Sequence, residues 1–214
     1  MMHRMAETEP PPPSAEPGSA GWWDQRYAGN DLMWSLEPNR FVVDECADLR
    51  PGCALDVACG EGRNAIWLAR IGWQVTAVDF SGAALDKARV LADRARVQVS
   101  WAAADVLSWL PAAAAAEQEY DLVVLAYLQV PSGGRRLVLT AAGASVTPGG
   151  SLLVVGHDRS NLDHGTGGPQ DPALLWSVDE VMLPGFSAVR AEVASRPVDK
   201  ATAYDTVVRL VHTP

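Results

Sequence analysis

Three aspartates and a glycine-rich turn are the residues of this chain whose types and spacing could do chemistry. Asp56 lies in a short apolar run that leads into the turn Ala58-Cys-Gly-Glu-Gly62. Asp79, 17 residues after Gly62, ends a second apolar run, and Asp105 follows a third. Ligands of open α/β sheets bind beyond the carboxyl ends of the strands. We therefore expect the three carboxylates to face one site.

The turn has the composition of a nucleotide-binding loop. Gly60 and Gly62 lack the Cβ atom that would block a sharp turn or a close ligand, and residues 63–70 have helical composition. Such a turn aims backbone N–H groups at whatever binds there. A carboxylate at the position of Asp79 can accept hydrogen bonds from both hydroxyls of a ribose, and Asp105 could accept one from an adenine amino group. Together these residues predict a site shaped for an adenosyl group.

Asp56 distinguishes between two ligands that contain adenosine. A carboxylate beside a pyrophosphate costs Coulomb energy in a partly buried site, whereas beside an ammonium group and a sulfonium it is favourable. The chain also lacks a Tyr-x-x-x-Lys pair of the kind that many short-chain dehydrogenases use for proton transfer. We therefore expect S-adenosylmethionine as the cofactor, and an NAD-dependent oxidoreductase is the disfavoured alternative.

The elements that must position these residues alternate along the chain. Apolar runs predict five strands, over residues 53–57, 74–79, 97–102, 120–126 and 151–156. Helices are expected between them, and Ser81 is the expected N-cap of the helix over 82–95. This alternation implies a parallel α/β sheet. We also expect a closing antiparallel hairpin, a turn and a long loop without regular structure, over 187–211, 147–150 and 157–176.

Composition and charge bound the class of protein. The chain has 214 residues, of which 48% are hydrophobic and 20% charged, as in a globular domain. A net charge of −9 argues against partners such as nucleic acid or an anionic membrane. Three cysteines without an apolar leader favour a cytoplasmic protein. Residues 1–20 are expected to form a disordered, proline-rich tail, and residues 21–214 one domain, monomeric or homodimeric.

Several segments together resemble the successive motifs of class I S-adenosylmethionine-dependent methyltransferases. The resemblance covers residues 22–157, and its segments are Asp56-Val-Ala-Cys-Gly-Glu-Gly-Arg-Asn64, Val75-Thr-Ala-Val-Asp-Phe-Ser81, Ala104-Asp-Val106, Tyr120-Asp-Leu-Val-Val124 and Thr147-Pro-Gly-Gly150. The residues from Gly60 to Asn64, with Trp23-Asp-Gln-Arg-Tyr27, resemble the tellurite-resistance and thiopurine methyltransferase-like branch. The resemblance implies a Rossmann-like, seven-stranded, mostly parallel sheet with helices on both faces and an antiparallel C-terminal hairpin.

The resemblance also implies roles for residues at matching positions. The loop from Asp56 to Gly62 would hold the methionine portion of the cofactor, Asp79 the ribose, and Phe80 the adenine. A tryptophan after the aromatic segment would lie over the cofactor. The full set of expected cofactor contacts is Trp34, Asp56, Ala58, Gly60, Gly62, Asn64, Asp79, Phe80, Ser81, Asp105, Val106 and Ala126.

Residues after the fourth and fifth predicted strands are the candidates for contact with a methyl acceptor. Tyr127, Gln129 and Asp158 are expected to touch the substrate, and His157 is the candidate general base because imidazole titrates near neutral pH. For His157 and Asp158, a hydrogen bond that anchors the loop is an equally weighted alternative. The spacing of the acidic and histidine residues over 157–164 matches no metal site, so no metal is expected.

These residues favour a small-molecule methyltransferase that acts by direct in-line transfer to a thiol, hydroxyl, amine or oxyanion. Nucleic-acid amino methyltransferases carry an Asn/Asp-Pro-Pro-Tyr/Phe element after the fourth strand, where this chain has Ala126-Tyr-Leu-Gln-Val-Pro131. The absence of that element and the acidic balance disfavour a nucleic-acid substrate. The alternative function is that of a regulatory module that binds S-adenosylmethionine without catalysis.

Overall fold

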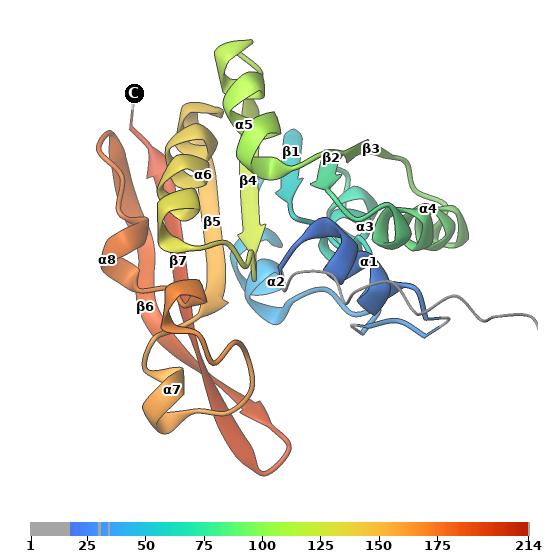
Figure 1. The fold of residues 1–214 in the computed structure, drawn as a ribbon. Helices are drawn as coiled ribbons and strands as arrows, with labels where there is room; N and C mark the ends of the chain where they lie inside the picture. Colours follow the sequence, from blue (N-terminus) through green and yellow to red (C-terminus); the bar gives the residue numbers. More distant parts are fainter. Residues whose placement is uncertain (1–17, 30, 34, 214) are drawn as a thin grey trace, which may run out of the picture.

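A seven-stranded sheet organises the computed structural model, which describes residues 18–29, 31–33 and 35–213 (Figure 1). The strand order is β3-β2-β1-β4-β5-β7-β6. The parallel part consists of β1 (Cys53–Val57), β2 (Gln74–Asp79), β3 (Val99–Ala103), β4 (Tyr120–Ala126) and β5 (Val146–His157). β7 (Ala201–His212) runs antiparallel to β5 and to β6 (Phe186–Val198). The expected fold class, including the C-terminal hairpin, is confirmed.

Helices cover both faces of the sheet (Figure 1). The core on one face contains residues of α5 (Val106–Ala115) and α6 (Ser132–Ala144), and the core on the other contains residues of α2 (Arg40–Cys46), α3 (Arg63–Arg70) and α4 (Gly82–Ala95). Within β4, Val123 and Leu125 face the first core, and Leu122 and Val124 face the second. All four are fully buried, which explains why this strand is an unbroken apolar run.

The first helix, α1 (Ala20–Tyr27), packs against α4, and its N-cap is Ser19, whose side chain accepts the Trp22 N–H. Of the residues 1–20 that were expected to form a tail, Ser19 and Ala20 belong to the start of this helix, and residues 1–17 lie outside the described part of the chain. Ser81 is confirmed as the N-cap of α4 because its hydroxyl accepts the Ala84 N–H.

Two predictions about irregular segments are wrong. No separate turn precedes β5, because the strand already begins at Val146 and a register shift in its pairing with β4 absorbs residues 147–150. The segment 157–176 is not devoid of regular structure: it contains α7 (Asn161–His164) and a 3₁₀ helix (Pro172–Leu174). A further short helix, α8 (Val178–Val181), follows.

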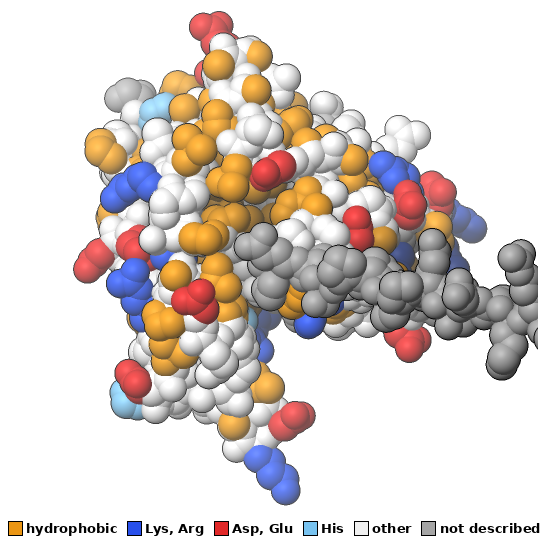
Figure 2. Space-filling model, in the orientation of Figure 1, with side chains coloured by type: hydrophobic (Ala, Val, Ile, Leu, Met, Phe, Trp, Pro, Cys, Tyr) orange, Lys and Arg blue, Asp and Glu red, His pale blue; other side chains and the backbone are white. Residues whose placement is uncertain are grey.

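The surface mixes charges of both signs. Figure 2 shows acidic and basic side chains scattered over one face with hydrophobic side chains between them. None of the helices in the described ranges is long and apolar enough to cross a membrane. The three cysteines are free thiols, with Cys46 and Cys59 buried and Cys53 exposed.

Gly156 of β5 lies directly against the indole ring of Trp176, which is 1% exposed. A Cβ atom on residue 156 would lie 2.2 Å from Trp176 Cδ1, so alanine would displace a buried ring. We expect Gly156→Ala to lower the free energy of unfolding by about 1–3 kcal/mol, as measured by urea denaturation.

Gly133→Ala in α6 is the control for this variant, because its Cβ would meet open space and alanine raises helix propensity. Equal losses of stability in the two variants would contradict the packing explanation.

Candidate active site

A cavity of about 1150 Å³ opens at the carboxyl ends of the parallel strands. Its walls include the segments that follow β1, β2, β4 and β5, part of α1, and residues 196–198 at the end of β6. The strand order reverses between β1 and β4, and such a switch point is where open α/β sheets bind ligands.

Asp79 ties the glycine-rich turn to the start of α4. Its Oδ2 accepts the Gly60 N–H at 2.8 Å, and its Oδ1 accepts the Ser81 N–H at 2.9 Å. The carboxylate is 7% exposed and lines the cavity. Burial raises the pKa of Asp79, although the backbone N–H groups of Ser81, Gly60 and Phe80 oppose this shift. Each carboxylate oxygen has a second lone pair, so Asp79 retains acceptor capacity toward the cavity.

Asp56 is buried beneath the turn and does not line the cavity. The Ala65 N–H donates to its carboxylate, while Oδ2 has no hydrogen-bond partner within the described ranges. Burial raises the pKa of Asp56 to about 7, and the nearby charge of Arg63 offsets this only in part. A buried acceptor left without a donor is unusual and marks a place where a proton or a cationic group can be accommodated.

The two glycines of the turn have different reasons to be glycine. Gly60, at φ +55°, lines the cavity, and a Cβ there would lie 3.0 Å from the Tyr27 hydroxyl. Gly62, at φ +79°, does not line it, and a Cβ there would lie 2.6 Å from the Trp101 ring. Gly62 therefore serves the close packing of the start of α3 against Trp101 of β3 and Ala88 of α4, and of the two glycines only Gly60 faces the cavity.

Glu61, which the sequence analysis missed, fastens the segment before α2 to this turn. It is 4% exposed, and its carboxylate accepts the Met33 N–H at 3.0 Å and pairs with Lys87 at 3.1 Å. The Lys87 ammonium group also donates to the Asp31 carbonyl. The expected lid residue in this segment, Trp34, lies outside the described residues.

The structure brings most of the expected site residues to the cavity wall. Those that line it are Ala58, Gly60, Asn64, Asp79, Phe80, Val106, Ala126, Tyr127, Gln129 and His157. Those that do not line it, among the described residues, are Asp56, Gly62, Ser81, Asp105 and Asp158.

Ser81 and Asp105 are engaged as helix caps. Ser81 is fully buried, and its hydroxyl donates to Asp24 of α1 as well as capping α4. Asp105 is exposed, and its Oδ1 accepts the Leu107 N–H at the start of α5. An N-cap and a strand-end ligand contact carry the same sequence signal, an acidic or hydroxyl residue between a strand and a helix.

Asp158 is a correction to the expected substrate contacts. Its Oδ1 accepts the Ser160 N–H at 2.9 Å, and its Oδ2 accepts the Thr206 hydroxyl at 2.6 Å. The side chain is 5% exposed and turned away from the cavity lining. Of the two alternatives for Asp158, a substrate contact and a hydrogen bond that anchors the loop, the structure shows the second.

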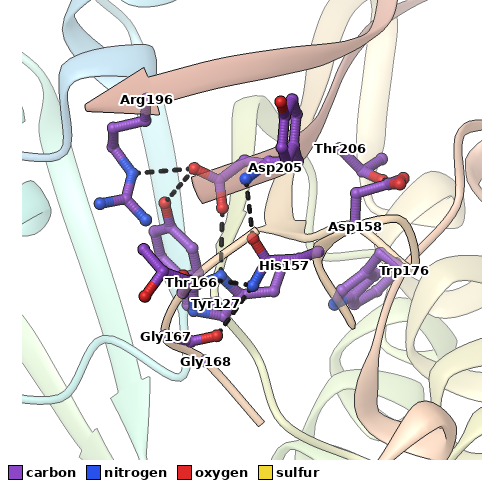
Figure 3. A network of polar contacts seen from close by, with 12 residues as sticks. Tyr127, His157, Asp158, Thr166, Gly167, Gly168, Trp176, Arg196, Asp205 and Thr206 are labelled. Carbon is purple, nitrogen blue, oxygen red and sulfur yellow. Dashed lines mark hydrogen bonds and ion pairs between the residues drawn. The ribbon is translucent and has the colours of Figure 1, made fainter. Parts of the chain in front are cut away.

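Asp205 of β7 is the centre of a buried polar network at the other end of the cavity (Figure 3). It is fully buried, and its Oδ2 accepts the Tyr127 hydroxyl at 3.1 Å and Arg196 Nε at 2.9 Å. Its Oδ1 lies 3.2 Å from His157 Nδ1. Burial alone would raise the pKa of Asp205, but His157 and Arg196 together lower it below its ordinary value.

Tyr127 links β4 to this network under backbone strain. It adopts φ +58°, a left-handed conformation that is costly for a residue with a Cβ and that recurs at functional sites. Its N–H donates to the Val155 carbonyl at 2.7 Å, and its ring lies 4.8 Å from that of His157. Burial, followed by the Asp205 charge, raises the pKa of Tyr127 to about 12. The hydroxyl is therefore a hydrogen-bond donor at neutral pH.

Asp205 and Arg196 were also missed by the sequence analysis, although a signal was present. Ala203, Asp205 and Val207 share one face of β7, and all three are buried. A carboxylate on an otherwise apolar face must have partners to offset its desolvation. The alternating pattern of β7 shows from the sequence that Asp205 is a buried carboxylate. Only the fold shows which side chains surround it.

Comparison with known proteins places this site in a family. Residues 54–150 match the model of a family described as "Methyltransferase domain". Residues 54–150 of this chain are therefore similar to a methyltransferase domain. An uncharacterized methyltransferase of Mycobacterium tuberculosis (strain ATCC 25618 / H37Rv) is 34% identical over 125 residues, which are 58% of this chain. The matched part spans 60% of that relative's length.

Solved structures of methyltransferases share the fold of this domain. TehB from Haemophilus influenzae superposes with a TM-score of 0.66 at 16% identity, over 90% of this chain and 66% of its own. The N-methyltransferase NodS from Bradyrhizobium japonicum WM9, in complex with S-adenosyl-l-homocysteine, gives a TM-score of 0.65 at 18% identity, over 89% of this chain and 97% of its own. At such identities the likeness concerns the methyltransferase fold alone.

The raised pKa of Asp56 makes the stability of the methyltransferase domain depend on pH. The pKa is 3.8 for an unperturbed aspartate and about 7 in the fold, so the folded chain binds more protons than the unfolded chain between these values. Stability therefore falls as pH rises through this window and levels off above it. We expect Asp56→Asn to gain stability relative to the native chain there by roughly 1.4 kcal/mol per pH unit.

Urea denaturation of both chains at several pH values measures this difference. Asp86→Asn is the control, since that side chain is 80% exposed on α4. A difference in the free energy of unfolding that stays constant across the window would contradict the raised pKa.

Proposed function

We propose that this chain transfers a methyl group from S-adenosylmethionine to a small molecule bound beside His157. The observation that carries the proposal is the position of Asp79, buried at the cavity wall and hydrogen-bonded to the glycine-rich turn at the switch point of a methyltransferase fold. The cofactor supplies a methyl group on a sulfonium, and its carbon–sulfur bond breaks as the bond to the acceptor forms.

Three features of the site fit the cofactor. The unpartnered, buried Oδ2 of Asp56 suits a ligand with an ammonium group and a sulfonium nearby. Gly60 leaves room at the turn where a Cβ would crowd Tyr27. Asp79 has lone pairs to spare for two ribose hydroxyls. We assign the adenine to the wall formed by Phe80 and Val106.

The remaining residues proposed to contact the cofactor form two groups, those that line the cavity and those that do not. Ala58, Asn64 and Ala126 line it and would touch the ligand directly. Gly62 and Ser81 would act through the shape of the turn and the start of α4.

The lining of the cavity favours a small anionic or polar partner. Among the described residues, its charged side chains are Arg26, Arg40, Arg63, Arg70, Arg94 and Arg196 against Glu61 and Asp79. This local excess of positive charge, in a chain of net charge −9, attracts groups such as the carboxylate of the methionine moiety. On the face in Figure 2, basic side chains are scattered among acidic ones and form no stripe of the kind that nucleic acid binding needs.

The chain's own contribution to the reaction is alignment, exclusion of water and proton removal. Trp22, Trp23 and Tyr27 of α1 lie along the cavity and would shield the reacting atoms. Tyr127 and Gln129 line the end near β4 and are the proposed acceptor contacts. His157 is the proposed proton acceptor.

Within the methyltransferases, we assign the chain to the tellurite-resistance and thiopurine methyltransferase-like branch. The support is the motif from Gly60 to Asn64, together with the segment Trp23-Asp-Gln-Arg-Tyr27.

Asp79→Ala tests the cofactor site. Loss of hydrogen bonds to the ribose should weaken the binding of S-adenosylmethionine by about 1–3 kcal/mol, or roughly 5- to 150-fold in Kd. Isothermal titration calorimetry of the native chain and the variant measures the change, with circular dichroism as the check on folding.

The control is Asp86→Ala, which removes an exposed carboxylate from α4 and should leave the affinity unchanged. Unchanged affinity in Asp79→Ala would remove Asp79 from the site. No binding by the native chain at high micromolar ligand would overturn the proposed function.

A further inference from the structure

We infer that Asp205 is a positioning residue that turns Nε2 of His157 toward the cavity as a general base, so that the methyl acceptor is a hydroxyl or an amine that must lose a proton. This inference rests on the proposed methyl transfer. It narrows the acceptor to protic nucleophiles and assigns a role to a residue far from the cofactor motifs.

The two sides of the His157 ring have different surroundings. Its Nδ1 is buried and lies 3.2 Å from Asp205 Oδ1, within ion-pair distance, and neither atom has a hydrogen-bond partner within the described ranges. The ring as a whole is 16% exposed and lines the cavity. Because Nδ1 is covered, the exposed part of the ring is elsewhere.

Gly168 covers a further part of the His157 ring. A Cβ on this residue would lie 2.7 Å from both Cδ2 and Cγ of His157 and 3.0 Å from Nδ1, so the glycine backbone lies over that part of the ring. Cε1 and Nε2 are the ring atoms left to face the cavity. The loop between β5 and α8 thus supplies a backbone face that covers one side of the imidazole.

The charge of Asp205 sets the tautomer of His157. The pKa of Asp205 is below its ordinary value, so the group is a carboxylate that can only accept hydrogen bonds. Its neighbour Nδ1 must then carry the proton, which leaves the lone pair of neutral imidazole on Nε2.

The carboxylate is itself fixed by groups from two other elements. Tyr127, at the end of β4, and Arg196, on β6, donate to its second oxygen. In the described structure, Tyr127 and Arg196 are the other titratable or charged groups that face His157 and Asp205. Arg63 of α3 interacts electrostatically with Tyr127 and with Arg196. The network therefore holds the Asp205 side chain in one orientation and its charge at one place.

The proton balance of the step follows from this tautomer. A lone pair on X forms the bond to the methyl carbon, the proton of X–H passes to Nε2, and the electron pair of the X–H bond remains on X. The pair of the breaking carbon–sulfur bond stays on sulfur, which gives neutral S-adenosylhomocysteine. The imidazolium, held at Nδ1 by Asp205, then returns the proton to solvent.

The same arrangement disfavours acceptors that carry no proton. An oxyanion or a thioether has no proton to lose when it attacks the methyl carbon, so it gains nothing from a base. Burying the Asp205 carboxylate among Tyr127, Arg196 and His157 has a desolvation cost. A role in proton removal by His157 would explain why the fold keeps a charged group there.

Nuclear magnetic resonance of the ring nitrogens tests the positioning without turnover. In the native chain labelled with ¹⁵N-histidine, we expect His157 to show the Nδ1–H tautomer at neutral pH. In Asp205→Asn the amide can donate to Nδ1, and we expect the proton to shift to Nε2. A native Nε2–H tautomer would overturn the inference, and this result does not depend on the variant folding.

Kinetics with defined probes test the acceptor class. A phenol, a primary amine and selenite are offered to the native chain with S-adenosylmethionine. We expect methylation of the phenol or the amine, and a loss of about 100- to 10,000-fold in kcat for Asp205→Asn with little change in KM. Methylation of selenite alone, or an unchanged kcat in Asp205→Asn, would contradict the inference.

Two glycine variants separate the position of the ring from backbone strain. Gly167 and Gly168 have φ of +72° and +74°, so alanine is strained at both, but only at 168 would its Cβ strike His157. We expect Gly168→Ala to lower kcat at least tenfold more than Gly167→Ala. Equal effects would contradict the role assigned to the ring position.

Calorimetry separates this inference from the proposed function. If the native chain binds no S-adenosylmethionine, the proposed function fails and this inference fails with it. If the chain binds the cofactor but His157 has the Nε2–H tautomer, only this inference fails. If none of the three probes is methylated, the tautomer alone decides the positioning role.

Discussion

The buried carboxylate of Asp79 holds together the two elements on which the cofactor end of the cavity depends. It accepts N–H groups from the turn after β1 and from the start of α4, so the two strand ends cannot move apart without leaving a buried charge unpaired. Ser81, fixed by the same carboxylate, caps α4 and receives α1 through Asp24. The aromatic side chains of α1 are thereby carried to the edge of the cavity.

The two ends of the cavity differ in how completely their carboxylates are satisfied. At the cofactor end, burial raises the pKa of Asp56 and Asp79, and one oxygen of Asp56 has no donor within the described ranges. At the acceptor end, Asp205 is surrounded by donors and its pKa is lowered. The first end therefore keeps a carboxylate oxygen without a donor, while the second end is organised before any ligand arrives.

The sequence predicted the parts of the site that depend on neighbours along the chain. Strand β2, the glycine turn and Asp79 follow one another closely, and local patterns identify all of them. Asp105 and Ser81 lie at the expected strand ends, but their immediate hydrogen bonds are helix caps, which local patterns do not separate from ligand contacts. Asp205 meets Tyr127 across 78 positions of the chain, and no local pattern predicts such a pair.

A crystal structure with S-adenosylhomocysteine bound tests the central claim that this cavity holds the adenosyl cofactor with the acceptor site beside His157. Our account predicts both ribose hydroxyls within hydrogen-bond distance of Asp79 and the sulfur atom facing the end of the cavity that holds Tyr127 and His157. A ligand whose ribose lies away from Asp79, or whose sulfur points away from His157, would contradict it.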